Sequence, residues 1–386
     1  MKRVAIVSRK MITGGVERAL IAMLKHIDYT TTEVDLYLEA LGGELFEELP
    51  KEVQCIQLPS VHGAEVLSHP LFAVRKLRIM LKLHSKRYSY IEQCWLSSQM
   101  LMPIRKEYDV AIAYHAPNTI PVFYVIDGMK ARKKILWLHS DLKNNAGDTE
   151  LALRYHSRYD QVFAVSRSAL DSFIQYHAEM QSRVSVFCNY IDAEDIRRKS
   201  YTGPVFFDEF SGVRILSIGR LDDQKGFDLA VTSCKALIDQ GYPIRWYVCG
   251  EGASRDLLEH MIRENGLDGQ FVLLGNQPNP YGYLRCCDLY VQPSRFEGYC
   301  ITAHEARVLA KPVVITDVAG ARDQFMDGVT GWIVPIDADA ITQQVAYCLE
   351  HPQEVQAVQA RLKDTKFEQA NQIDAIFDEV RSDSFE

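Results

Sequence analysis

The 386-residue chain has no apolar run approaching 18 residues, so we expect no segment to span a bilayer. Residues 1–6 lead directly into a strand-like run without an apolar stretch and cleavage site, so we expect no signal peptide. The nine cysteines are scattered and include no Cys-x-x-Cys pair, which argues against a zinc knuckle or a redox dithiol. Dispersed cysteines of this kind are usual in reducing compartments, and the sequence therefore predicts a cytoplasmic protein.

Several common ligand signatures are also missing. The glycine pair Gly14-Gly15 has no third glycine at the dinucleotide offset, and no P-loop lysine follows it. No Asp-x-Asp follows a strand in the loops expected to bind ligand. Asp337-Ala338-Asp339 precedes a predicted helix, where N-capping explains it better. We therefore expect no bound metal and no cofactor.

Positive charge is scarce overall but concentrated in the first half. The net charge is −8, with 27 Lys and Arg against 23 Asp and Glu in residues 1–200, and 16 against 28 in residues 201–386. The basic stretches lack interleaved aromatic residues, so we do not expect a nucleic-acid partner. The asymmetry predicts that the first half meets something anionic.

Residues 71–90 alternate apolar side chains with cations and contain no acidic residue. A basic amphipathic helix of this kind is typical of a peripheral contact with an anionic membrane. The alternative is a helix packed on the core with a solvated cationic face. The cations are Arg75, Lys76, Arg78, Lys82, Lys86 and Arg87.

Short β-branched runs alternate with helix-length segments along the whole chain. Many of these runs are continuously apolar, as expected for strands covered by helices on both faces of a parallel sheet. The sequence Ser200 to Pro204 resembles a linker and separates two such series. The pattern predicts two α/β domains with doubly wound sheets. The predicted strands are 4–8, 34–38, 53–58, 110–114, 135–139, 162–165 and 184–187, then 213–218, 245–249, 271–274, 289–291 and 313–316.

Ligands of doubly wound sheets bind at the carboxyl ends of the strands, and glycine and cations follow several of the predicted strands. Arg220 and Lys225 flank a turn, and both can reach one diphosphate. Gly250-Glu251-Gly252 and Asn276 follow the next two strands. In the first half, Gly14-Gly15 and His139 hold comparable positions. The alternative for Gly14-Gly15 is a loop that requires positive φ. The alternative for His139 is a structural histidine that caps the next segment.

Two glutamates, Glu297 and Glu305, stand eight residues apart where a turn leads into an apolar run. A helix that begins just after Gly298 would place Glu305 two turns in, on the side of Glu297. Carboxylates beside a helix N-terminus suit a polyhydroxylated, phosphorylated ligand such as a nucleotide sugar. The alternative is an ordinary helix start whose acidic residues complement the dipole.

The order of these motifs, continued by the run from Lys311 to Val314, resembles that of family 4 glycosyltransferases. The resemblance implies a GT-B fold, in which two Rossmann-like doubly wound domains face each other across a cleft. It implies an acceptor-binding domain over 1–200, a nucleotide-sugar-binding domain over 201–365 and a last helix over 366–386 that packs back on the first domain.

The same resemblance implies retaining, metal-independent transfer of a hexose-type sugar from a UDP-sugar. The acceptor would be a glycan or a lipid-linked saccharide of cell-surface polysaccharide or glycolipid synthesis. The cationic window of residues 71–90 adds the expectation that it is reached at the inner face of the membrane. The catalytic set would be Glu297, His139, Arg220 and Lys225. The implied donor-binding residues are Gly14, Gly15, Arg220, Lys225, Gly250, Asn276, Glu297, Gly298, Tyr299, Cys300, Ile301 and Glu305, with Arg220 and Lys225 on the diphosphate and Glu305 on the ribose.

The chain departs from the family pattern at the donor-sugar pocket. Tyr299-Cys300 stands where the family commonly has Phe-Gly, and Lys311 replaces a frequent glycine. Because of the change at Tyr299-Cys300, the family pattern does not predict the shape of this pocket. Two other enzyme classes share the architecture, a sugar-nucleotide epimerase and a phosphorylase. A further alternative is a non-catalytic nucleotide-sugar binding protein.

Overall fold

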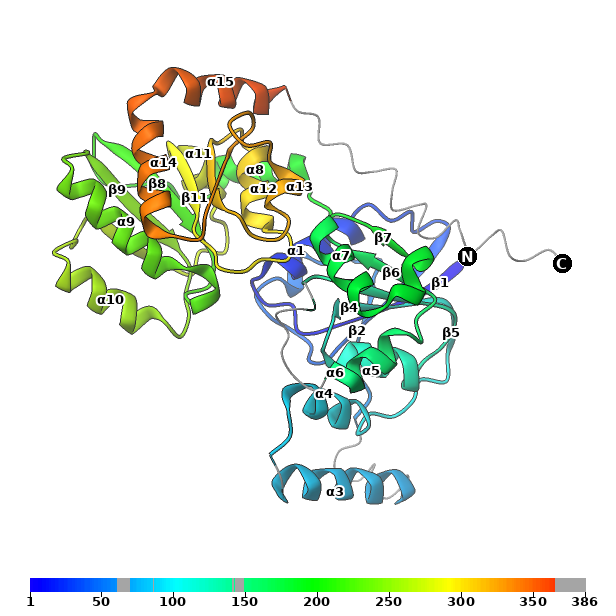
Figure 1. Ribbon diagram of the computed structural model, residues 1–386. Helices are drawn as coiled ribbons and strands as arrows, with labels where there is room; N and C mark the ends of the chain where they lie inside the picture. The colour runs from blue at the N-terminus through cyan, green and yellow to red at the C-terminus, as the bar shows by residue number, and fades with distance from the viewer. Residues whose placement is uncertain (61–69, 86, 141, 143–148, 365–386) are drawn as a thin grey trace. The chain divides into compact units, whose positions relative to one another are not determined.

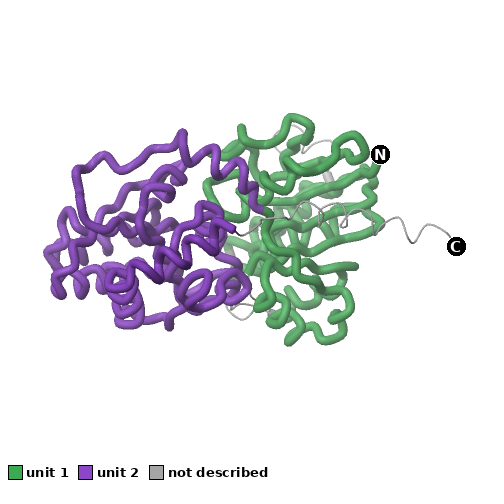
Figure 2. Tube along the Cα trace, turned by 90° about the horizontal axis from the view of Figure 1, so that it is seen from above, with its two compact units in different colours: residues 1–190, 369–386 green, residues 191–368 purple. Residues whose placement is uncertain are grey.

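The computed structural model describes residues 1–60, 70–85, 87–140, 142 and 149–364. The chain forms two compact units, the first from Met1 to Tyr190 and the second from Ile191 to the end of the described chain (Figure 2). The helix expected over 366–386 lies outside the described residues. Among the described residues, no helix is long and apolar enough to cross a membrane.

The first unit is a seven-stranded parallel sheet in the order β3-β2-β1-β4-β5-β6-β7 (Figure 1). Its strands are β1 Lys2–Ser8, β2 Thr32–Leu38, β3 Gln54–Gln57, β4 Glu107–Ala116, β5 Lys130–Leu138, β6 Gln161–Ala164 and β7 Val184–Val186. Its α-helices are α1 Gly15–Leu24, α3 Pro70–Ser85, α4 Tyr90–Ser98, α5 Ile120–Gly128, α6 Thr149–His156 and α7 Arg167–Tyr176. The strand order reverses between β1 and β4, which makes the carboxyl ends of these strands a ligand-binding position.

The second unit repeats this plan with six parallel strands in the order β10-β9-β8-β11-β12-β13. The strands are β8 Val213–Ile218, β9 Ile244–Cys249, β10 Phe271–Gly275, β11 Leu289–Gln292, β12 Val313–Thr316 and β13 Trp332–Val334. The helices are α8 Ala193–Thr202, α9 Phe227–Asp239, α10 Arg255–Glu264, α11 Tyr281–Cys286, α12 Ile301–Val308, α13 Ala321–Gln324, α14 Ala338–Glu350 and α15 Pro352–Lys363. Here the order reverses between β8 and β11. Both units confirm the predicted doubly wound α/β class; β13, only three residues long, was not predicted.

The boundary between the units lies ten residues before the expected linker. Residues 193–202 form α8, which packs against α11 and α12 of the second unit. The carbonyl of Lys199 accepts a 3.0 Å hydrogen bond from Asn279, and that of Ser200 accepts one of 3.0 Å from Arg285. These backbone contacts fix the helix to the second unit, so Ser200 to Pro204 is not a free linker.

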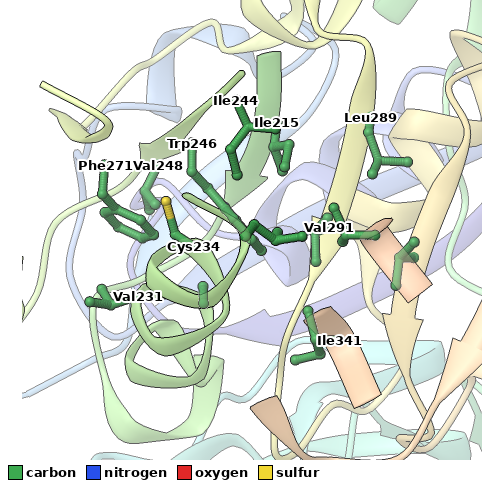
Figure 3. Close-up of a cluster of buried hydrophobic side chains, with 14 of the residues drawn as sticks. Ile215, Val231, Cys234, Ile244, Trp246, Val248, Phe271, Leu289, Val291 and Ile341 are labelled. Carbon is green, nitrogen blue, oxygen red and sulfur yellow. The ribbon is translucent and has the colours of Figure 1, made fainter. Parts of the chain in front are cut away.

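Each sheet is buried between helices, as its continuous apolar strands require. In the second unit, Trp246 and Phe271 stack on one face, with ring centroids 6.0 Å apart (Figure 3). Val231 and Cys234 of α9 and Ile341 of α14 cover this face. The core thereby holds β8, β9 and β11 in place, and the loops at their carboxyl ends have a rigid base.

Candidate active site

Three loops at the carboxyl ends of β8, β9 and β10 pack backbone against backbone. The amide of Gly219 donates to the carbonyl of Cys249 at 3.0 Å, and the amide of Gly250 donates to that of Gly275 at 2.8 Å. A Cβ on Gly250 would lie 1.8 Å from the carbonyl oxygen of Gly219. In this structure, the neighbouring loop is the reason that position 250 needs glycine. Asn276 is exposed directly after β10.

The turn after β8 brings Lys225 to the loop after β11. A 3-10 turn over Asp223–Lys225 is capped by Asp222, which accepts from the Lys225 amide at 3.1 Å. Gly226 follows in the left-handed region at φ 65°, and a Cβ there would lie 2.1 Å from the carbonyl oxygen of Pro293. Only glycine combines this φ with this contact, so the two loops meet at that point.

Lys225 and Glu297 form a buried ion pair at this junction. Nζ of Lys225 lies 2.6 Å from Oε1 of Glu297. Burial alone would lower the pKa of Lys225, but the negative charge of Glu297 outweighs burial and raises the pKa above its ordinary value. The lysine therefore stays charged at neutral pH and has two further N–H donors for another anion.

Arg220 lies on the same turn but is oriented differently from Lys225. Its side chain is 70% exposed and meets Asp222 at 3.4 Å. Arg295, which the sequence analysis did not single out, is held in place instead: its guanidinium binds both carboxylate oxygens of Asp228, at 2.7 and 2.6 Å. Arg220 is thus exposed to an incoming anion, in addition to the two remaining N–H donors of Lys225.

Helix α12 begins at Ile301, two residues later than expected. Cys300 precedes it as N-cap with φ 44°, in the left-handed region, and makes no side-chain cap. This is the position where the resembling family commonly has glycine, and the backbone explains that preference. Tyr299 is buried, and its carbonyl accepts a hydrogen bond from Gln324.

Glu305 lies on α12 and is buried away from solvent. Its Oε1 accepts a 2.7 Å hydrogen bond from the hydroxyl of Tyr281 on α11. Glu297, in contrast, is bound through Ser294 and Lys225 on the loops after β11 and β8. The two glutamates therefore occupy separate hydrogen-bonding environments and can contact different parts of one extended ligand.

In the first unit, three neighbouring strands bring polar residues together at their carboxyl ends. Gly14 has extended backbone (φ −166°), so positive φ is not the reason for glycine here. A Cβ on Gly14 would lie 2.4 Å from Oε2 of Glu17, a buried carboxylate that the sequence analysis overlooked. Oε1 of Glu17 lies 4.0 Å from Nδ1 of His115. Gly15 begins α1.

His139 directly follows β5 and joins this group. Its ring centroid lies 6.2 Å from that of His115 and 4.7 Å from that of Tyr114. Neither ring nitrogen of His139 has a hydrogen-bond partner of normal geometry among the described residues. Burial, assisted by His115, holds the pKa of His139 well below its ordinary value, so the ring is neutral and can act as a donor or acceptor to a ligand hydroxyl.

Comparison with known proteins identifies the second unit. Residues 211–365 match the family model of glycosyl transferases group 1. The chain is a glycosyltransferase, and its second unit matches group 1. This match covers β8 to α15 and so includes Lys225, Glu297 and Glu305.

Relatives and solved structures extend the likeness of this glycosyltransferase to the full length. A Campylobacter jejuni protein named N-acetylgalactosamine-N,N'-diacetylbacillosaminyl-diphospho-undecaprenol 4-alpha-N-acetylgalactosaminyltransferase is 24% identical over 87% of each chain. The crystal structure of Anabaena Alr3699/HepE in complex with UDP and glucose covers 99% of this chain and 100% of its own, with a TM-score of 0.72 and 18% identity. The structure of TarM aligns with a TM-score of 0.70 at 11% identity, over 99% of each chain. The glycosyltransferase has the GT-B fold.

Proposed function

We propose that the glycosyltransferase transfers a hexose-type sugar from a UDP-sugar to a glycan or lipid-linked acceptor, with retention of configuration, in polysaccharide or glycolipid synthesis. The C. jejuni relative is named for transfer to a diphospho-undecaprenol-linked saccharide, and HepE was crystallised with UDP and with UDP-glucose. These names support a UDP-sugar donor and a lipid-linked or glycan acceptor for this chain.

The observation that carries the proposal is the buried pair of Lys225 and Glu297, beside the exposed Arg220. When the bond between sugar and diphosphate breaks, negative charge grows on the leaving diphosphate. Lys225 has two N–H donors left after its contact with Glu297, and Arg220 offers a planar fork that matches phosphate oxygens. Lys225, which Glu297 fixes before the reaction, stabilises that charge without reorganisation.

Each glutamate has a different part in this proposal. Glu305, held by Tyr281, binds the ribose hydroxyls, and Glu297 binds the transferred sugar together with the backbone of Gly298 to Ile301. The neutral His139 contacts the sugar from the first unit, and Gly14-Gly15 approaches the diphosphate. With two cations on the diphosphate, the reaction needs no metal ion.

The experiment is a thermal-shift screen with UDP-glucose, UDP-galactose and their N-acetylamino forms, followed by an assay of donor hydrolysis without acceptor. A ligand that binds only the folded state raises its melting temperature. We expect one donor to stabilise and be hydrolysed, in EDTA as in buffer. Glu305→Ala and Arg220→Ala should lose hydrolysis, whereas Arg263→Ala, an exposed arginine on α10, should keep it.

Several outcomes would contradict the proposal. If Glu305→Ala and Arg220→Ala both bind the donor as tightly as the parent, the assignment of these residues to the donor site is wrong. An epimerised donor would indicate an epimerase, and a sugar phosphate would indicate a phosphorylase. Binding without turnover on any acceptor would indicate a binding protein. Loss of activity in EDTA, restored by a divalent ion, would overturn metal independence.

The acceptor part of the proposal includes a membrane contact through α3. Several of its apolar side chains face solvent, with Leu71 88%, Leu77 57% and Leu81 62% exposed, whereas Ile79 is buried. A groove of about 590 Å³ between α3 and α4 is lined by Val74 and Trp95 together with cations. The cations are Arg75, Arg78 and Lys82.

Exposed leucines beside cations match a bilayer surface, where acyl chains cover the leucines and anionic headgroups pair with the cations. We expect salt-sensitive sedimentation with vesicles containing phosphatidylglycerol. Arg75→Gln with Arg78→Gln should weaken it about 25-fold, at about a factor of five per charge. The control, Lys130→Gln with Arg132→Gln, removes two exposed cations of β5. Equal binding by the two double variants would exclude α3 as the contact.

A further inference from the structure

Gln292, the last residue of β11, is a fully buried amide at the centre of a hydrogen-bond chain. Its Oε1 accepts from the hydroxyl of Tyr290 and, at 3.2 Å, from that of Thr302 on α12. Its Nε2 donates to Oγ of Ser294 at 2.8 Å. Because Ser294 gives its only hydroxyl proton to the carboxylate of Glu297, its oxygen must accept, and the NH2 end of the amide therefore faces Ser294. The amide therefore has one orientation.

This hydrogen-bond chain ends at one carboxylate oxygen of Glu297, Oε1. Oγ of Ser294 donates to Oε1 at 2.7 Å, and Nε2 of Gln292 lies 3.4 Å from the same atom. Nζ of Lys225 is the third donor to Oε1, at 2.6 Å. Among the described residues, no donor contacts Oε2 of Glu297. Three donors therefore converge on one carboxylate oxygen and leave the other for a ligand.

This asymmetry fixes the carboxylate, which would otherwise turn easily. The terminal torsion of a glutamate is broad and roughly two-fold, so an unrestrained carboxylate exchanges its two oxygens at little cost. Donors from Lys225, Ser294 and Gln292 on a single oxygen oppose that rotation. All three side chains lie within the core or at its edge, where hydrogen bonds to a charged group are strong.

We propose that Gln292 and Ser294 are positioning residues, which hold Oε1 of Glu297 on Lys225 so that Oε2 accepts a hydrogen bond from a hydroxyl of the donor sugar. The inference rests on the proposed function, since it assumes that Glu297 meets the transferred sugar. It adds that Tyr290 and Thr302, which donate to Gln292, set the direction of the hydrogen bonds that lead through Ser294 to Glu297. The donor sugar is then recognised by a single carboxylate oxygen of fixed orientation, and the nucleotide binds to other residues.

The proposal separates binding of the sugar from binding of UDP. Ser294→Ala removes a donor from Oε1 and should lower kcat/KM for donor hydrolysis about tenfold, since a lost hydrogen bond to a charged group is worth about one factor of ten or more. Affinity for UDP alone should stay within about twofold. The matched control is Ser217→Ala, which removes a buried hydroxyl that donates to Val291 at 2.6 Å and does not contact Glu297. It should leave kcat/KM within about twofold.

A second variant supplies a readout that a merely structural role would not give. Gln292→Glu keeps the acceptor for Tyr290 and Thr302, and its protonated form donates to Ser294 as the amide does. The ionised form cannot donate and adds a charge beside Glu297. The ratio of kcat/KM to that of the parent should therefore be near one at low pH and fall about tenfold or more as pH rises. Gln292→Met, which cannot donate, should be impaired equally at every pH.

The outcomes distinguish the two proposals. If the parent binds neither UDP nor any of the four UDP-hexoses, the proposed function fails and the positioning role fails with it. If the parent hydrolyses a UDP-hexose but Ser294→Ala equals Ser217→Ala, or the ratio for Gln292→Glu is constant with pH, only the positioning role is overturned. If Ser294→Ala weakens UDP as much as UDP-hexose, the residues act on the fold of the site and not on Glu297.

Discussion

The hydroxyl of Tyr281 donates a 2.7 Å hydrogen bond to Oε1 of Glu305, and both side chains are buried. Tyr281 opens α11 and Glu305 lies in the middle of α12, so the bond connects two helices of the second unit. A buried carboxylate without its donors carries a desolvation penalty of about 1–3 kcal/mol or more. Tyr281 therefore stabilises a glutamate whose proposed task is to accept hydrogen bonds from a ribose.

We expect Tyr281→Phe to weaken UDP binding about three- to tenfold, because Glu305 loses an orienting donor. Titration calorimetry with UDP measures the change. Tyr283→Phe is the control: it removes a second α11 hydroxyl, from a buried residue that makes no contact with Glu305 among the described interactions. Equal affinities for the two variants would show that Tyr281 does not act through Glu305.

The ion pair of Lys225 and Glu297 gives a prediction on stability. Lys225→Met leaves the carboxylate buried without its cation, which costs about 3–5 kcal/mol, whereas the double variant with Glu297→Gln should recover a large part of this loss. Because the pKa of Lys225 is raised, the contribution of the pair is complete below the unfolded pKa near 10.5 and is lost only as pH rises through the higher folded value. Chemical unfolding at pH 7 and at pH 9 should therefore give the same difference between Lys225→Met and the parent. A double variant less stable than Lys225→Met alone would contradict this.

The architecture could be predicted from the sequence because parallel strands buried on both faces consist of continuous apolar residues, and glycine often follows their carboxyl ends. The sequence located Lys225 and Glu297 but not their contact, since the contact joins residues 72 apart across two loops. Cys300 illustrates the limit: its left-handed backbone delays α12 to Ile301, and no local signal marks cysteine for that conformation.

The supporting residues were missed for a different reason. Ser294 and Gln292 act through Glu297, and a sequence shows such a relation only as polar residues inside a buried strand. Gln292 after the apolar run of β11 was a usable signal of this kind. The outward orientation of the α3 leucines was equally hidden, because a basic amphipathic pattern is the same whether the apolar side meets the core or solvent.

Gly226 and Gly241 form a matched pair for testing how the two site loops meet. Both glycines have left-handed backbone, at φ 65° and 86°, but a Cβ on Gly241 would meet nothing within 4 Å, whereas one on Gly226 would lie 2.1 Å from the carbonyl of Pro293. We expect Gly241→Ala to cost about 1 kcal/mol from backbone strain alone. Gly226→Ala should cost about 1–3 kcal/mol more, because the loop of Glu297 must shift. Equal losses in chemical unfolding would show that the contact with Pro293 is easily relieved.

Acid should destabilise the first unit through His156. The imidazole is completely buried, its Nε2 donates to the carbonyl of Pro117 at 2.9 Å, and Nδ1 has no partner among the described residues. Burial, helped by His177, lowers the pKa of His156 from 6.5 to about 4, against the opposing effect of the Pro117 bond. Between these values the unfolded chain binds a proton that the folded chain does not, so stability falls as pH drops through this window, by up to about 3 kcal/mol.

His156→Gln keeps a donor for Pro117 and cannot titrate, so its stability should depend less on pH between about 6.5 and 4 than that of the parent. Unfolding followed by circular dichroism at half-unit pH steps measures the two slopes. His260→Gln, an exposed histidine of α10, is the control and should retain the slope of the parent, since it leaves the buried imidazole of His156 in place. If His156→Gln keeps the full slope, another group accounts for the acid sensitivity.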